Sequence, residues 1–143
     1  MTRFHRRPQH NSTDPTDLVA GLRMGAQGFC GEIAAVELLI AHRSWLTRDD
    51  FLERFIHTGP VPLDSVEPAL AWVRWTAAAT AFDSGRLACS SGEAAVLDIA
   101  IALATGRRFP TSALSSLDRD NFAKVLTAIV RAGGHKNVQV EIR

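Results

Sequence analysis

The sequence predicts an all-α fold, a single-domain bundle of about five or six helices with a short β-strand at the C-terminal end. Three observations support this. Apolar residues recur every three to four positions in several segments, other segments are apolar on all sides as buried helices are, and capping residues separate the segments. The chain has 143 residues, of which 46% are hydrophobic and 22% charged. That composition supports one core without disulfides.

The first three predicted helices cover residues 17–29, 32–42 and 47–57. The first carries glycines at positions 21, 25 and 28, and the row continues to position 31. Each glycine inside a helix costs about 1 kcal/mol relative to alanine, so either the helix ends early or its bare face lets another backbone approach closely. The second segment is apolar all round and should be buried. The third is amphipathic, and Thr47 with Asp50 forms a capping-box pattern.

The next three predicted helices cover residues 65–82, 91–104 and 118–132. The first of these is the longest, and Trp72 and Trp75 lie three positions apart on one of its two apolar stripes. Residues 91–104 are apolar all round beyond their first turn. A serine caps this helix, and a glutamate lies in its first turn. Residues 118–132 are amphipathic and stop at two glycines.

The C-terminal residues alternate between apolar and polar side chains, with Val138, Val140 and Ile142 on one face. This period of two predicts a strand. A lone strand in a helical protein needs a partner, and we expect the N-terminal arm or a second subunit to supply it.

Residues 1–16 are polar and basic, which predicts a flexible arm, and residues 17–143 form the single helical domain. The chain shows neither a secretory signal pattern nor a membrane-spanning run. Its two cysteines, Cys30 and Cys89, form no CxxC motif, and burial is the more common state of such thiols. These features favour a cytoplasmic protein.

Two parts of the sequence resemble each other. Residues 31–38 match residues 92–99, and residues 46–51 match residues 117–122. Either a helix hairpin has been duplicated, with its two copies packed about a pseudo-twofold axis, or two alanine- and leucine-rich helices resemble each other by chance.

Three isolated charges lie in apolar segments. Glu37 and Asp98 sit midway along the predicted buried helices, and Arg74 is the only charge between Glu67 and Asp83. A buried carboxylate is costly unless it is paired, so we expect Arg74 to contact Glu37 or Asp98. The contact would be either a structural ion pair or a polar ligand-binding pocket. We expect no metal and no cofactor, because neither a metal-ligand spacing nor a nucleotide-binding motif occurs.

The function favoured by the sequence is a non-enzymatic protein-interaction or regulatory module, expected to be a homodimer. Its interface would include Trp72, Trp75 and the C-terminal residues Val138, Val140 and Ile142.

Two alternatives stay open. A DNA-associated transcriptional regulator would use the basic arm, through Arg3, Arg6 and Arg7. A small-ligand-binding protein or enzyme would use the pocket around Arg74. Nucleic acid is the less favoured partner, since the net charge is only +1.

Overall fold

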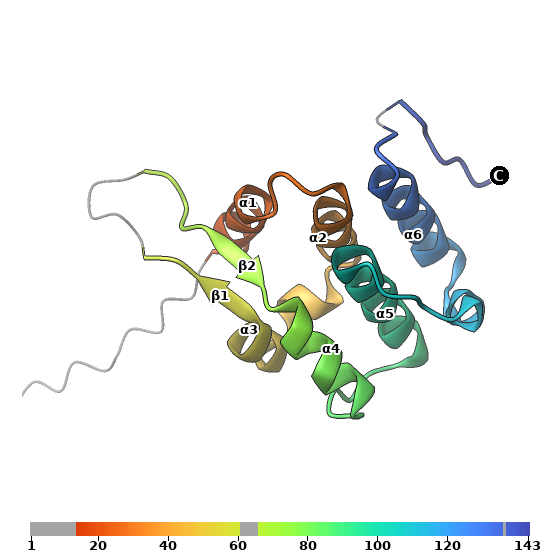
Figure 1. Cartoon of the computed structure of the whole chain (residues 1–143), viewed down its shortest axis with the longest axis horizontal. Coiled ribbons are helices and arrows are strands. Elements are labelled where there is room, and N and C mark those ends of the chain that lie inside the picture. The colour runs from red at the N-terminus through yellow and green to blue at the C-terminus, as the bar shows by residue number, and fades with distance from the viewer. Residues whose placement is uncertain (1–13, 61–65, 136) are drawn as a thin grey trace, which may run out of the picture.

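The computed structural model describes residues 14–60, 66–135 and 137–143, and this part of the chain is mostly helical with a small two-stranded sheet (Figure 1). The all-α class is confirmed at that level. In chain order the elements are α1 (Pro15–Gly25), α2 (Cys30–His42), the 3-10 helix η1 (Ser44–Thr47), α3 (Asp49–Phe55), β1 (Ile56–Thr58), β2 (Ala71–Val73), α4 (Trp75–Asp83), α5 (Ser91–Thr105), the 3-10 helix η2 (Thr111–Ser116) and α6 (Arg119–Ala132). None of the helices in these ranges combines the length and the apolar character needed to cross a membrane.

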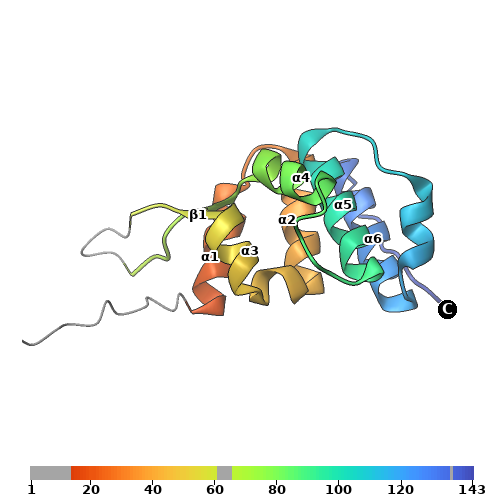
Figure 2. The same cartoon turned by 90° about the horizontal axis from the view of Figure 1, so that it is seen from below.

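Helices α2 and α5 form the centre of the core, as their apolar sequences predict. They pack against each other, and α6 packs against both of them (Figure 2). Leu39 of α2, Val96 and Ile99 of α5 and Val125 of α6 are each at most 1% exposed. Helices α1 and α3 and the hairpin lie on the other side of α2, where Trp45, Phe51 and Phe55 extend the same buried cluster.

The glycine row allows close backbone approach, as predicted. A Cβ atom on Gly21 or Gly25 would clash with the carbonyl oxygen of Ala69 or Ala71 respectively. A Cβ on Gly31 would clash with the carbonyl oxygen of Leu103 at the end of α5. The bare side of α1 therefore seats the β2 backbone, and the start of α2 seats the end of α5.

The predicted helix over residues 65–82 is confirmed from Trp75 onward and wrong for the residues before it that the structure describes. Residues 71–73 form β2, and α4 begins only at Trp75. Strand β2 pairs antiparallel with β1, in the register Ile56 with Val73, His57 with Trp72 and Thr58 with Ala71. The backbone amide of Arg74 also donates to the carbonyl of Phe55 at 2.7 Å. Aromatic and β-branched residues suit strands as well as helices, and here the neighbouring backbone decides between them.

The same pairing shortens the predicted helix over residues 47–57. Helix α3 ends at Phe55 because the chain continues directly into β1. The predicted capping box at Thr47 is also wrong: Arg48 is the N-cap residue, and the Thr47 hydroxyl donates to the Ser44 carbonyl within η1. By contrast, the predicted cap of α5 is confirmed as a capping box between Ser90 and Glu93.

The two similar sequence segments fold into the same order of elements, a buried helix, a 3-10 helix and a second helix. Their second helices pack differently. Helix α6 lies against α2 and α5, whereas α3 lies against η1, α4 and β1. A twofold arrangement would require α3 to contact α5 as α6 contacts α2, so the predicted pseudo-twofold packing is wrong. A duplication at the level of sequence stays a prediction.

The ends of the helical region also differ from expectation. Helix α1 begins at Pro15, inside the predicted arm, with Asp14 as its N-cap. The rest of the arm, including Arg3, Arg6 and Arg7, lies outside the described residues. At the other end, residues 137–143 form no strand, because no strand among the described residues lies beside them and offers ladder hydrogen bonds.

Candidate functional site

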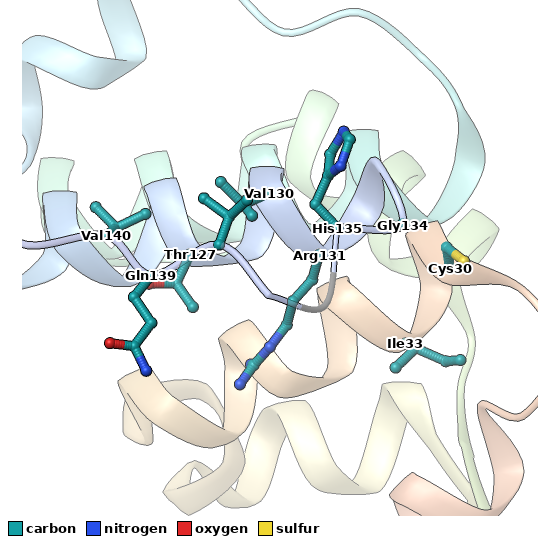
Figure 3. Close-up of a pocket in the computed structure, with 10 residues that line it drawn as sticks. Cys30, Ile33, Thr127, Val130, Arg131, Gly134, His135, Gln139 and Val140 are labelled. Carbon is teal, nitrogen blue, oxygen red and sulfur yellow. The ribbon is translucent and has the colours of Figure 1, made fainter.

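A groove with a volume of about 610 Å³ opens between the start of α2, the end of α6 and the C-terminal residues (Figure 3). We call it the C-terminal groove. Its lining is formed by Cys30, Ile33, Thr127, Val130, Arg131, Gly134, His135, Val138, Gln139 and Val140. It is a candidate binding surface, since concave and mainly apolar surfaces are where partners and ligands dock.

The groove exists because the chain reverses after α6. Helix α6 ends before Gly133, and Gly134 has φ +77°, a conformation that glycine adopts without strain. The chain then runs back along α6 (Figure 3). Near the last residues of this returning chain, the Ile142 carbonyl accepts a hydrogen bond of 3.2 Å from the guanidinium of Arg119, in the first turn of α6. This hydrogen bond ties the end of the C-terminal segment, residues 137–143, to the first turn of α6.

From residue 139 to residue 143 the side chains alternate in exposure, whereas Val138 is exposed. Val140 and Ile142 are half-buried, whereas Gln139, Glu141 and Arg143 are exposed. This is the burial pattern of an extended chain with one face on the protein. Glu141 and Arg143, two positions apart on the outer face, form an exposed ion pair at 3.5 Å.

Apolar side chains beside the groove reach solvent. Ile33 and Val138 line it, with exposed fractions of 38% and 54%, and Phe29, next to Cys30 in sequence, is 54% exposed. Arg131 and His135 are the basic side chains of the lining, and they point in opposite directions (Figure 3). The surface thus combines an apolar centre with polar edges, the usual anatomy of a protein interface.

The expectation of buried cysteines is wrong. Cys30 is exposed at the first position of α2 and lines the groove, and Cys89 is exposed just before α5. For Cys89, partial desolvation and the nearby Glu93 carboxylate raise the thiol pKa, against an opposing effect of Arg48. A raised pKa leaves this thiol less nucleophilic at neutral pH.

One form of the predicted ion pair joined Arg74 to Glu37, but the structure does not bring these two residues together. Its carboxylate accepts two hydrogen bonds from Arg23 of α1, at 2.8 and 3.2 Å. The pair raises the pKa of Arg23 further, mainly through the hydrogen bond. The Arg23 side chain is 53% exposed, and pairs of this kind contribute at most about 1 kcal/mol. The contact ties α1 to α2.

Asp98 also has a different partner. Arg107, in the loop after α5, donates to Asp83 at 2.8 and 3.1 Å and to Asp98 at 3.4 Å. Burial raises the pKa of Asp98, and Arg107 only partly opposes that effect. The pKa of the exposed Asp83, by contrast, is lowered by its hydrogen bonds from Arg107. This cluster links the end of α4 to α5 and to the following loop.

Arg74 is exposed and lies on the hairpin side of the molecule. Its Nη2 is 3.4 Å from Nδ1 of His57, whose ring stacks on Trp72 with centroids 5.7 Å apart. The predicted contact of Arg74 with Glu37 or Asp98 is therefore wrong. The structure places these three residues in three separate polar contacts and does not assemble them into one pocket.

The two tryptophans do not share a helix face. Trp72 is half-buried in β2, and Trp75 is 9% exposed in the chain's own core. Trp75 is thus covered by its own chain, and a role of Trp72 in an interface stays a prediction. For the nucleic-acid alternative, α3 carries Asp49, Asp50 and Glu53 on its exposed side, and acids at that position repel phosphate.

Sequence reasoning missed Phe29, Ile33, Arg23 and Arg107 as site or network residues. Arg23 lies 14 positions from Glu37, and Arg107 lies nine positions from Asp98. These separations exceed one or two helical turns, so no local sequence pattern predicts the two pairs. One signal could have identified Ile33. It lies in the first turn of an all-apolar helix, and the end of a buried helix can reach the protein surface. Comparison with protein-family models, curated proteins and solved structures finds no match for this chain.

Proposed function

We propose that this chain is a non-enzymatic protein-interaction module that acts as a homodimer, and that two copies meet through the C-terminal groove. The observation that carries the proposal is the exposure of Phe29, Ile33 and Val138 around an open apolar groove. Exposed apolar surface of this kind is stabilised when another protein covers it, because burial gains about 25 cal/mol per Å².

A second copy is the occupant that suits the charges best. An isologous interface places the same surface on both sides of a twofold axis, so the surface must complement itself. The groove contributes the cationic guanidinium of Arg131, and the C-terminal segment beside it contributes the exposed carboxylate of Glu141. A surface with both signs of charge around an apolar centre can match its own copy without like charges meeting.

The test is the mass of the full chain in solution, measured by light scattering after size-exclusion chromatography. We expect twice the chain mass of 15.5 kDa. Val138→Asp places a charge in the proposed interface and should weaken dimerisation at least about tenfold, because a buried unpaired charge is costly. Val138 lies outside the core cluster, so the fold should persist.

The matched control is Val66→Asp, a fully exposed valine on the hairpin side, which is not among the groove residues. This variant should keep the dimer mass. A wild-type chain that stays at monomer mass up to about 100 μM, where interfaces far weaker than those of stable homodimers would form, would overturn the proposal. Equal weakening by both substitutions would overturn the assignment of the groove.

A further inference from the structure

The C-terminal segment, residues 137–143, offers an unpaired backbone edge as well as an apolar face. Among the described residues, no backbone hydrogen bond is made by its amides, and its one backbone contact of this type is the Ile142 carbonyl with Arg119. Figure 1 shows the segment at an outer edge of the molecule, beyond α6. An extended chain with free backbone groups is a template for pairing with another strand.

We infer that the C-terminal segments of two copies pair as an antiparallel β-ribbon whose twofold axis passes at Val140. This inference rests on the proposed homodimer and names the part of the chain that joins the two copies. The alternating exposure of residues 139–143 shows that the segment already has the period-two arrangement of a strand. Pairing would supply the ladder hydrogen bonds that the isolated chain lacks.

The side chains select this register. With Val140 opposite its own copy, Val138 faces Ile142 of the partner on the apolar side. On the other side Gln139 faces Glu141, and Asn137 faces Arg143. Directly opposed apolar pairs stabilise a ribbon, and directly opposed like charges destabilise it. In this register every apolar residue faces an apolar residue, and every charged residue faces an uncharged polar one.

Neighbouring registers are less favourable. An axis at Glu141 sets two carboxylates directly opposite each other. An axis at Gln139 brings His135 opposite Arg143, which repel when the imidazole is charged. A shift by an odd number of residues would move the apolar set of one strand to the polar face of the other.

The experiment is single-cysteine cross-linking in solution. Cys30 and Cys89 are both exposed, so they are first replaced by serine, and the mass of this background is checked by light scattering. Cysteine is then placed singly at positions 139, 140, 141 and 142. A short bismaleimide joins two copies only where identical positions meet across the axis. We expect Val140→Cys to cross-link at least about fivefold more than the variants at 139 and 141, because only this pair lies directly opposite itself.

The outcomes separate this inference from the proposed function. A dimer by mass with no preference for position 140 overturns the ribbon or its register and leaves the homodimer standing. A cross-linking maximum at 139, 141 or 142 overturns the register. A monomeric wild-type chain overturns both. A control cysteine at Val66, on the hairpin side, should give no cross-link in any of these cases, and a Val66 cross-link equal to that at 140 would show random collision and overturn the inference.

Discussion

Replacing Gly21 or Gly25 by alanine is the most direct test of how α1 is seated. In a helix with free surroundings, glycine to alanine would stabilise the protein by about 1 kcal/mol. Here the added methyl group would overlap the carbonyl oxygen of Ala69 or Ala71. Those oxygens belong to a backbone fixed by the hairpin, including the 2.8 Å hydrogen bond from Gly59 to Leu70, and cannot rotate away as the end of a side chain could.

The magnitude follows from the two opposing effects. Forcing extra methyl groups into a well-packed site typically costs about 1–3 kcal/mol. Overlap with backbone places Gly21→Ala and Gly25→Ala at the upper end of that range. Subtracting the gain of about 1 kcal/mol in helix propensity leaves a net loss of about 2 kcal/mol for each variant. This is a large fraction of the stability of a typical domain.

Urea unfolding followed by tryptophan fluorescence measures the loss as a lower midpoint at an unchanged slope. The matched control is Gly92→Ala, near the start of α5. Its Cβ would make only an ordinary contact, 3.4 Å from the Ser116 carbonyl oxygen. That variant should be unchanged or more stable by up to about 1 kcal/mol. If Gly21→Ala and Gly25→Ala prove as stable as Gly92→Ala, the close approach of α1 to β2 is refuted.

Two further predictions concern buried polar groups. Trp45→Phe should lose about 1 kcal/mol more than Trp75→Phe, because the Trp45 indole donates to the Glu93 carbonyl at 3.0 Å, whereas the buried Trp75 indole finds no acceptor among the described residues. Desolvation and, secondarily, Lys124 lower the pKa of His42 below 6.5. The unfolded chain therefore binds this proton at higher pH than the folded chain, and stability should fall as pH drops through 6.5.

Urea unfolding checks both predictions. Equal losses for the two tryptophan variants would contradict the hydrogen-bond argument. For His42 the unfolding series is run at neutral and mildly acidic pH with His42→Asn as the comparison, and this variant should lose less stability on acidification than the wild type. The nearby acids Glu93 and Asp118 oppose the lowering of the His42 pKa but do not cancel it. An identical pH dependence in the two proteins would therefore contradict a lowered pKa of His42.

Much of the helical architecture could be predicted from local sequence. The caps of α5 and the glycines after α6 are local features, and the structure uses them as the sequence suggests. The all-apolar stretches became the central helices, because a helix without a polar side must be enclosed by other protein. The close approach allowed by Gly21 and Gly25 was also predictable, although not the element that approaches.

The candidate site was predictable only in part. The period-two pattern at Val138, Val140 and Ile142 predicted that the C-terminal segment is a strand that pairs with another strand. The groove itself depends on the reversal after Gly134 and on the start of α2, which lies about 100 positions earlier in the chain. No local pattern specifies which side of α6 such a segment returns along.

By itself, the sequence determined the helical class, the buried helices, the ends of α5 and α6 and the need to accommodate a row of glycines. These follow from periodicity, capping and backbone freedom, which act over a few residues. Only the tertiary structure decided that residues 71–73 are a strand and that the isolated acids pair with Arg23 and Arg107. The physical reason is that both outcomes depend on which distant backbone or charge lies alongside, and that is settled only when the elements pack.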